Sequence, residues 1–592
     1  MHARAALAGT SDDYPGRGRW LHFLGHHLES RYNRTPNPLD LEAATTTWLA
    51  AWNLTNASGY DRLGAAVHAA TMFVHSSKDL SKAGSLLHDA TQLIPLTTSR
   101  LLQREDQQHI LGKLSHLSIA PFTTAVLLEA GQSPLEVLRL LELSRSITNS
   151  QLLDYRSDIS DLVEQHPRLA ADFDSLRQEI DTPPPCIESS NIPLKQHLQI
   201  QRGADCRRTK VNRDFNDILS QIRQQPGFEN FMDAPSYAYL LSAAREGPIV
   251  VLNATKYRSD AILITTEAKS KSISLPDLSI DSVEKYLGTC ACKTGDNDVK
   301  RELLGWLWKA AVLPVLLELG FYPKAINPLP RIWWIGVSIM AKALIHAATK
   351  FRNGRIQKTI FQYCIPSYTS TIRALEYSRA RQLPKQNASI LIVTMPTTPG
   401  ESSLSGAINE ADKIKSHLGA YSSTVDTLQR PTAEHVLQAL PSYSIAHFAC
   451  HGVSSHDPAR SHLLLLKEST ADDGSCIEEV DKLRVKDIAL LKLPTARLAY
   501  LSACSTATSK SFELLDEVTH IVSSFHIAGF TNVIGSLWPA EDEACQKMAA
   551  HFYTRLRETD NVAESYHSAV RELMDQKPSQ PLYWAPFILF GA

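Results

Sequence analysis

The sequence predicts a helical N-terminal half followed by an α/β half built on a mostly parallel, doubly wound sheet. Up to about residue 178, leucines such as Leu21, Leu24 and Leu28 recur at three- and four-residue spacings, which is the period of helices that bury one face. After about residue 245, apolar residues form short continuous runs instead, such as 390–394 and 498–503. Such runs are typical of strands buried on both faces of a parallel sheet, and their alternation with helices predicts double winding.

Small residues alternate with leucines in the helical half. Segments 63–70 and 83–95 place alanine and glycine beside leucine, and the second ends in a proline. This is how stacked helical hairpins pack. The pattern resembles degenerate tetratricopeptide repeats, and an unrelated helical bundle is the alternative.

Composition argues against several classes of main partner. The chain has 592 residues, 43% of them hydrophobic and 21% charged, which is typical of globular domains. A net charge of −2 argues against nucleic acid or an anionic membrane as the partner.

Nine scattered cysteines and an N-terminus without an apolar signal core favour the cytoplasm. The apolar run 303–322 contains Lys309, Pro314 and Glu318, so we expect a buried or half-buried helix and no membrane span.

Breaks in composition divide the chain into four parts. We expect helical repeats over 1–180, and a linker with a connecting helix over 181–230, because residues 182–185 read Thr-Pro-Pro-Pro. An α/β part follows over 231–384, in which 248–253 and 260–264 look like paired strands. A second α/β part covers 385–592.

Two predicted strands of the last part lead to a histidine and a cysteine. His451 and Cys504 are 53 positions apart, and each follows an apolar run. In an open parallel sheet, ligands bind outside the carboxyl ends of the strands. A thiol and an imidazole brought there form the pair that cysteine nucleophilic catalysis needs. The interval also fits caspase-type enzymes.

The surrounding residues carry a more specific likeness. The motif residues are 447–452, 457–458, 461, 501–506, 516–518, 528–530, 533–538, 542–543 and 584–587. Together they resemble the CHAT domain, a caspase-like module associated with tetratricopeptide repeats, in its fungal form. Residues 329–334 and 344–348 resemble the N-terminal, pseudo-caspase-like part of the same domain. The resemblance implies a clan of cysteine peptidases that includes caspases, metacaspases, gingipain-like enzymes and separase.

The resemblance also implies roles for particular residues. Cys504 would be the nucleophile, and His451 would protonate the leaving amine and assist thiolate formation. The main-chain amides of Gly452 and Cys504 would form the oxyanion hole, as in relatives of the clan. For each residue alone, the alternative is structural: a buried thiol at a strand end, an ordinary histidine, or a glycine that ends a strand.

Acidic residues near the expected mouth of the site are candidates for substrate recognition. Clan members that cut after lysine or arginine use a carboxylate in the first specificity pocket. Asp542 and Asp516 are our candidates among Asp516, Glu517, Glu541 and Asp542; each could instead be a solvated charge or helix cap. His447, deeper in its strand, is expected to be structural.

We expect neither a metal nor a cofactor. Cys290 and Cys292 lack a companion pair, His22, His26 and His27 are expected to face solvent, and no phosphate loop is present. The leading hypothesis is a cysteine endopeptidase acting on a protein substrate, with helical repeats that bind a protein partner and regulate access. The alternative is a catalytically silent CHAT-fold scaffold or signalling adaptor. A third hypothesis, a nucleotide-dependent regulator, has little support because the sequence contains no phosphate loop.

Overall fold

We describe a computed structural model of the chain, divided into two compact units: residues 1–119 with 139–237, and residues 120–138 with 238–592. It describes residues 2–592 except 12–13, 15, 99–103, 155–158, 182–209, 212, 227, 229–230, 233, 293–294, 382–387, 419–421, 456–457, 471–475, 504–505, 508–516 and 518–519.

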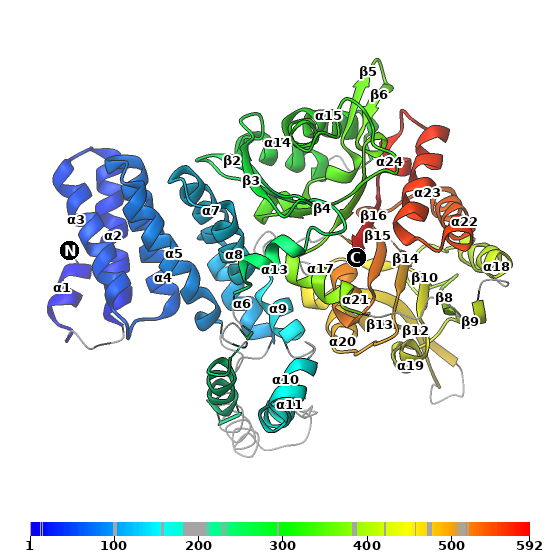
Figure 1. The fold of residues 1–592 in the computed structure, drawn as a ribbon, viewed down its shortest axis with the longest axis horizontal. Coiled ribbons are helices and arrows are strands. Elements are labelled where there is room, and N and C mark those ends of the chain that lie inside the picture. The colour runs from blue at the N-terminus through cyan, green and yellow to red at the C-terminus, as the bar shows by residue number, and fades with distance from the viewer. Residues whose placement is uncertain are drawn as a thin grey trace. The chain divides into compact units, whose positions relative to one another are not determined.

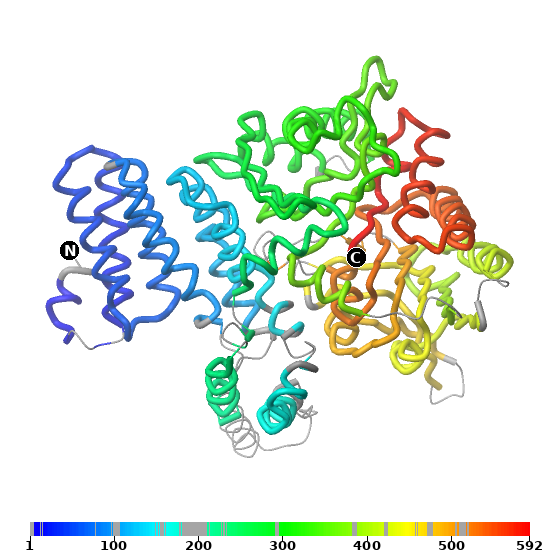
Figure 2. Tube along the Cα trace, in the orientation of Figure 1, coloured from blue at the N-terminus to red at the C-terminus, as the bar shows by residue number. Residues whose placement is uncertain are grey.

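The first unit is a succession of helices, which begins in blue in Figure 2 and continues into cyan and green. It begins with α1 (His2–Ala8), α2 (Arg17–Arg34), α3 (Pro38–Asn53), α4 (Gly59–Met72) and α5 (Leu80–Thr97), labelled in Figure 1. Short polar residues begin three of these helices. Asn37, Ser58 and Asp79 each accept a hydrogen bond from a backbone amide in the first turn, which satisfies donors that have no partner inside the helix.

Close helix crossings in this unit depend on glycine. A Cβ atom at Gly25 of α2 would lie 2.6 Å from the Trp48 ring of α3, and one at Gly64 of α4 would lie 2.8 Å from the His22 ring of α2. Trp48 is fully buried. The alternation of small and large residues noted in the sequence therefore lets adjacent helices approach closely.

The unit continues through α6 (Arg104–Ser115), α9 (Ile147–Asp154), α10 (Ser160–Gln165) and α11 (Pro167–Asp181). Phe173 of α11 packs against Phe215 with ring centroids 5.4 Å apart, and Ile222 is fully buried in the same cluster. The helical segment that follows residue 209 therefore buries its apolar face within this unit. Helix α7 (Ile119–Glu129) belongs, from residue 120 on, to the second unit, and α8 (Pro134–Ser144) is divided between the units.

The second unit is built on one sheet of eleven strands (Figure 1) in the order β3-β2-β1-β4-β7-β16-β15-β14-β10-β8-β9. The strands are β1 (Ile249–Ala254), β2 (Ser259–Ile264), β3 (Ser270–Ser274), β4 (Arg331–Gly336), β7 (Ile365–Tyr368), β8 (Ala388–Thr394), β9 (Ser422–Gln429), β10 (Ile445–Ala449), β14 (Leu498–Ser502), β15 (Asn532–Ser536) and β16 (Phe587–Gly591). The predicted pair 248–253 and 260–264 is confirmed as the antiparallel ladder between β1 and β2.

Helices cover both faces of the sheet, which confirms double winding. Ile445 of β10 packs in the core beside α18 (Gly406–Leu418), α22 (Asp542–Thr559) and α23 (Val562–Gln576), whereas Phe448 of the same strand packs in the core beside α19 (Ala433–Ala439), α20 (Val485–Ala489) and α21 (Ile521–Ala528). Since successive residues of a strand point to opposite faces, a continuous apolar run is needed to fill both layers.

The last strand joins two halves of the sheet that run in opposite directions. β16 is parallel to β7 but antiparallel to β15, so β1, β4 and β7 run opposite to β14, β10 and β8. The carboxyl ends of the two groups therefore lie at opposite edges of the sheet. His346 lies in the short helix Ile345–Ala347 after β4 and is fully buried. Its Nδ1 atom lies 2.8 Å from the Tyr368 hydroxyl, and its Nε2 atom lies 2.9 Å from the Ala585 carbonyl oxygen.

The long apolar run near residue 310 is buried, as predicted. It forms α15 (Asn297–Leu307), a π-helical turn Trp308–Val312 and α16 (Leu313–Glu318), and Leu303, Leu304 and Leu307 are fully buried. Within the described part of the chain, no single helix has the length and apolar composition to cross a membrane; one bent pair, residues 107–115 with 119–129, meets those two criteria together.

Candidate active site

The strands that lead to His451 and Cys504 are neighbours in the sheet. β10 and β14 are parallel, with Ala449 paired to Ser502, so His451 and Cys504 each follow the last registered pair by two residues. Cys504 itself lies outside the described residues. β8 lies between β10 and β9 in the sheet. The chain passes from β8 to β9 on one side of β8 and then to β10 on the other side. Such a reversal of strand order is where open α/β sheets bind ligands.

The His451 ring is held by a backbone carbonyl. The side chain is half-buried, and its Nε2 atom lies 2.8 Å from the carbonyl oxygen of Ser402, in the loop before α18. Because a carbonyl oxygen can only accept a hydrogen bond, Nε2 carries the hydrogen in this arrangement. Nδ1 then keeps its lone pair and is the ring nitrogen that can exchange a proton with a nucleophile.

Sequence reasoning missed Ser402 because it acts through its main chain. Any residue except one that disturbs the loop would supply the same carbonyl, so residue type carries no signal at this position. Nothing in the linear pattern connects 402 with 451; the connection arises when the loop after β8 passes the end of β10.

The backbone around His451 is tied to a hairpin. Gly452 begins the short strand β11 (Gly452–Val453), which pairs with β12 (His462–Thr470), and β12 pairs in turn with β13 (Cys476–Arg484). The Leu464 amide donates to the His451 carbonyl at 2.9 Å. These bonds fix the backbone on which the imidazole and the Gly452 amide depend.

The described residues on either side of Cys504 are anchored to β15. The Ser536 hydroxyl donates to the Ala503 carbonyl at 2.7 Å, and the Ser536 amide donates to Thr506 Oγ1 at 3.0 Å. A Cβ atom at Gly535 would lie 2.8 Å from that same Thr506 oxygen and 2.4 Å from Val522. The Gly-Ser pair of the sequence motif therefore holds both ends of the segment that carries the candidate nucleophile.

A small cavity of about 40 Å³ lies at these strand ends. Its walls come from the ends of β10, β14 and β15, the start of β16, and the first two turns of α18 and α22 with the loops before them. The described lining residues are Leu404, Gly406, Ala407, Glu410, Ala449, Cys450, Leu501, Ser502, Ala503, Ser536, Ala540, Asp542, Cys545, Gln546 and Phe587. Since one water molecule needs roughly 10–15 Å³ of such a volume, the cavity has room for about three water molecules. That is enough room for the head group of a long side chain.

Among the described residues, two carboxylates line the cavity, Glu410 and Asp542. Asp542 is exposed, in the first turn of α22. Its neighbours point elsewhere, because Lys577 lies 3.5 Å from Glu541 and 3.4 Å from Glu543. Of the other acidic candidates, Glu517 is buried and Asp516 lies outside the described residues.

Glu410 is a residue that the sequence reasoning did not single out. It is 4% exposed, and one carboxylate oxygen lies 3.2 Å from Nε2 of the fully buried His447. The other ring nitrogen of His447 lies 3.1 Å from the Tyr553 hydroxyl, and the ring stacks on Tyr500 with centroids 4.8 Å apart. Burial, assisted by the charge of Glu410, raises the pKa of both tyrosines, so their hydroxyls stay neutral.

This network fits the expectation that His447 has a structural role, since it is packed among aromatic rings beneath the cavity floor. Glu410 lies on α18, the helix that follows β8, and this position is the sequence feature that could have pointed to it. One acidic residue on an amphipathic helix is too common a feature to be recognised without the tertiary contact.

The doubly wound sheet, in which the neighbouring parallel strands β10 and β14 end at the same level, is a caspase-like α/β fold. Residues 301–592 match the family model of the CHAT domain, so the chain carries a CHAT domain over these residues. No curated protein matches the sequence.

Solved structures that resemble this one include a cysteine proteinase and a separase–securin complex. Gingipain R, an Arg-specific cysteine proteinase known from Porphyromonas gingivalis, is 11% identical and has a TM-score of 0.32, with 48% of this chain and 67% of that chain covered. The Saccharomyces cerevisiae separase–securin complex is also 11% identical and has a TM-score of 0.43, with 100% of this chain and 48% of that chain covered. This chain thus spans about half the length of that relative.

Proposed function

We propose that this protein is a cysteine endopeptidase in which Cys504 is the nucleophile and His451 the proton carrier. The observation that carries the proposal is the parallel register of β10 and β14, which ends both strands at the same level of the sheet. The hydrogen bond from His451 Nε2 to the Ser402 carbonyl supports it, because that bond leaves Nδ1 as the catalytic nitrogen.

In the proposed reaction the thiolate of Cys504 attacks the carbonyl carbon of the scissile peptide bond. The negative charge that develops on the carbonyl oxygen is stabilised by the amides of Gly452 and Cys504. His451, protonated at Nδ1, donates that proton to the leaving amine, and an acyl-enzyme remains on sulfur. Water then hydrolyses the thioester, and the imidazole accepts its proton.

The two carboxylates of the cavity support a preference for a basic side chain before the cut. Asp542 at the rim and Glu410 deeper in the wall would face a lysine or arginine head group, and charge-assisted hydrogen bonds are stronger than neutral ones. Asp516 is a second candidate for the same task. The helical unit would bind a protein partner or substrate, since arrays of helical hairpins provide extended recognition surfaces.

A thiol-reactive peptide probe tests the proposal directly. An acyloxymethyl ketone peptide with lysine or arginine next to the warhead is expected to label the wild-type chain once, and to spare Cys504→Ala. Cys545→Ala is the matched control, because this half-buried thiol lines the same cavity, and it should label like wild type. Equal labelling of wild type and Cys504→Ala, or none of either, would favour the silent scaffold or adaptor.

Removing the charge of Asp542 is expected to change substrate preference. In Asp542→Asn, kcat/KM for a substrate with arginine before the cut should fall about 10- to 100-fold, the size of one lost charged hydrogen bond. Cleavage of a substrate with a neutral residue there should change little. Glu543→Gln is the control, since Glu543 pairs with Lys547 and Lys577. Parallel losses on both substrates would mean that Asp542 does not read the side chain.

A further inference from the structure

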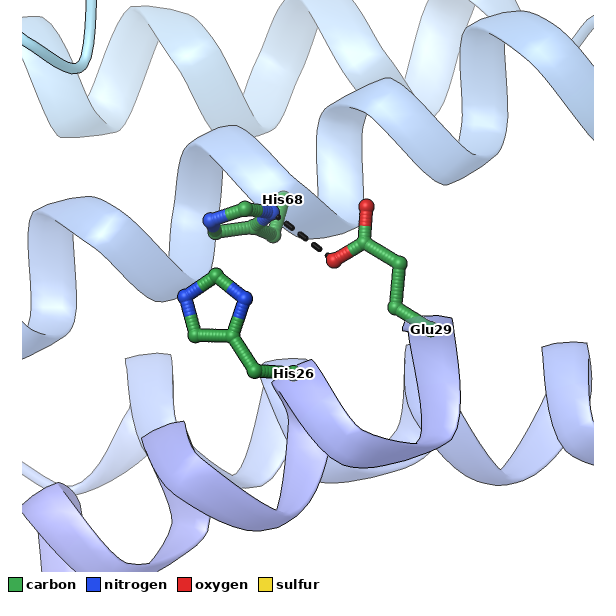
Figure 3. A group of neighbouring side chains, drawn as sticks. All are labelled: His26, Glu29 and His68. Atoms are coloured by element: carbon green, nitrogen blue, oxygen red, sulfur yellow. Dashed lines mark ion pairs between the residues drawn. The ribbon is translucent and has the colours of Figure 1, made fainter. Parts of the chain in front are cut away.

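Three potential metal ligands converge in the helical unit, remote in sequence from the candidate dyad. His26 and Glu29 lie one turn apart on α2, and His68 faces them from α4 (Figure 3). One ligand atom from each lies within 4.8 Å of the others. The expectation that the histidines of α2 face solvent holds for His27, which is exposed, but it is wrong for His22 and His26, which are half-buried.

The helix packing fixes where these rings lie. Trp48 of α3 stacks on the His68 ring with centroids 4.5 Å apart and meets the His26 ring edge-on at 5.1 Å. Gly25 allows the Trp48 ring to approach α2. The rings thus lose little further freedom on binding an ion, because their positions are already determined by packing.

The distances are close to those of a bound ion. His68 Nδ1 lies 3.0 Å from a Glu29 carboxylate oxygen, and zinc binds nitrogen and carboxylate ligands at about 2.0–2.2 Å. Two ligands of a tetrahedral ion are therefore separated by about 3.3–3.6 Å. The three ligand atoms lie within 4.8 Å of one another, so side-chain rotations of His26, Glu29 and His68 would be needed to bring all of them to that separation. The side chains of His68 and Glu29 are 24% and 14% exposed, which leaves an entry path.

The chemical state of the rings also suits a metal. Burial, with the neighbouring His68 and His22, lowers the pKa of His26 to about 4, so this ring is neutral at physiological pH. Burial also lowers the pKa of His22, whose Nδ1 is buried without a hydrogen-bond partner and whose ring centroid is 4.8 Å from that of His26.

We propose that His26, Glu29 and His68 bind a zinc ion that links α2 to α4 in the first helices of the chain. Two imidazoles and one carboxylate form a donor set that zinc uses in proteins. The ion would cross-link two helices that are separated in sequence by α3. This inference does not depend on peptidase activity.

The test uses the full-length chain carrying Cys504→Ala, so that a reactive thiol does not compete for the metal. After EDTA treatment and dialysis, titration with zinc chloride alone is followed by calorimetry and by metal analysis. We expect one equivalent bound and a higher Tm with zinc than with EDTA. His26→Ala, His68→Ala and Glu29→Gln should each weaken binding by more than about 100-fold, beyond the loss seen for outer ligand partners.

His27→Ala is the matched control, because this exposed residue lies on the same helix, and it should bind zinc like the parent chain. Melting curves in EDTA show whether each variant is folded; Glu29→Gln, which keeps the shape of the side chain, serves if an alanine variant is not. Absence of zinc binding by the parent chain, or full binding by folded His68→Ala or Glu29→Gln, would overturn the proposal and leave a packed aromatic cluster with one ion pair.

Discussion

Replacing His451 with alanine is expected to lower kcat for peptide cleavage by about 10²–10⁴-fold, the range that a positioned acid–base residue contributes. The loss should appear in kcat more than in KM, because the imidazole acts on the leaving amine in the transition state and adds little to substrate binding. The measurement is steady-state cleavage of a fluorogenic peptide, together with the rate of probe labelling at Cys504.

His435→Ala provides the comparison for this variant. His435 is exposed on α19 of the same unit, so its removal changes the number of histidines without affecting the strand ends. Its kinetics should match those of the wild type. If His451→Ala cleaves peptide as fast as His435→Ala, the imidazole has no part in the chemistry and the dyad assignment is wrong.

Loss of β16 is expected to unfold the second unit. Phe587, Ile588, Leu589 and Phe590 are each at most 4% exposed, and they alternate between the two core layers of the sheet. At about 1.5–3 kcal/mol for each buried side chain, the strand contributes about 6–12 kcal/mol, which is comparable to the whole stability of a typical domain, about 5–15 kcal/mol. A chain ending at Pro586 should therefore be recovered as aggregate, since the edges of β7 and β15 would be open.

A single substitution gives a graded version of the same prediction. Phe590→Ala should reduce the free energy of unfolding by about 3–5 kcal/mol, measured by urea-induced unfolding of the full chain. Its ring contacts the buried rings of His520 and His526 at centroid distances of 5.6 and 5.3 Å. Ile477→Ala, at a site that is 43% exposed, should change stability by less than about 0.5 kcal/mol. Similar losses in both variants would show that β16 is not a central element.

Strands of the second unit were predictable from the sequence where a continuous apolar run marked a strand buried on both faces. The runs that became β8, β10, β14 and β15 are buried on both faces, and a strand of that kind needs apolar residues at most positions. The same holds for α15 and α16, where leucines fill the core. The direction of β16 was not predictable, because whether a short apolar segment pairs parallel or antiparallel depends on the strands that it meets.

The candidate site was only partly predictable for a similar reason. His451 and Cys504 follow recognisable strands, so their residue types and positions are visible in the sequence. Ser402 contributes a backbone carbonyl, and Glu410 is one acid among many on helical surfaces. The convergence of His26, Glu29 and His68 depends on how three helices pack around Trp48, which no spacing along the chain describes.

By itself, the sequence indicated a helical half followed by an α/β half, several of the strands of the sheet, and a candidate histidine and cysteine that each follow a strand-forming apolar run. Periodicity and turn residues are local properties, and they act over a few residues at a time. Only the tertiary structure decided that β16 unites two opposed groups of strands, that a main-chain carbonyl orients His451, and that Asp542, rather than Glu541 or Glu543, lines the cavity. These contacts join residues far apart in the chain, and the packing that creates them has no local signature.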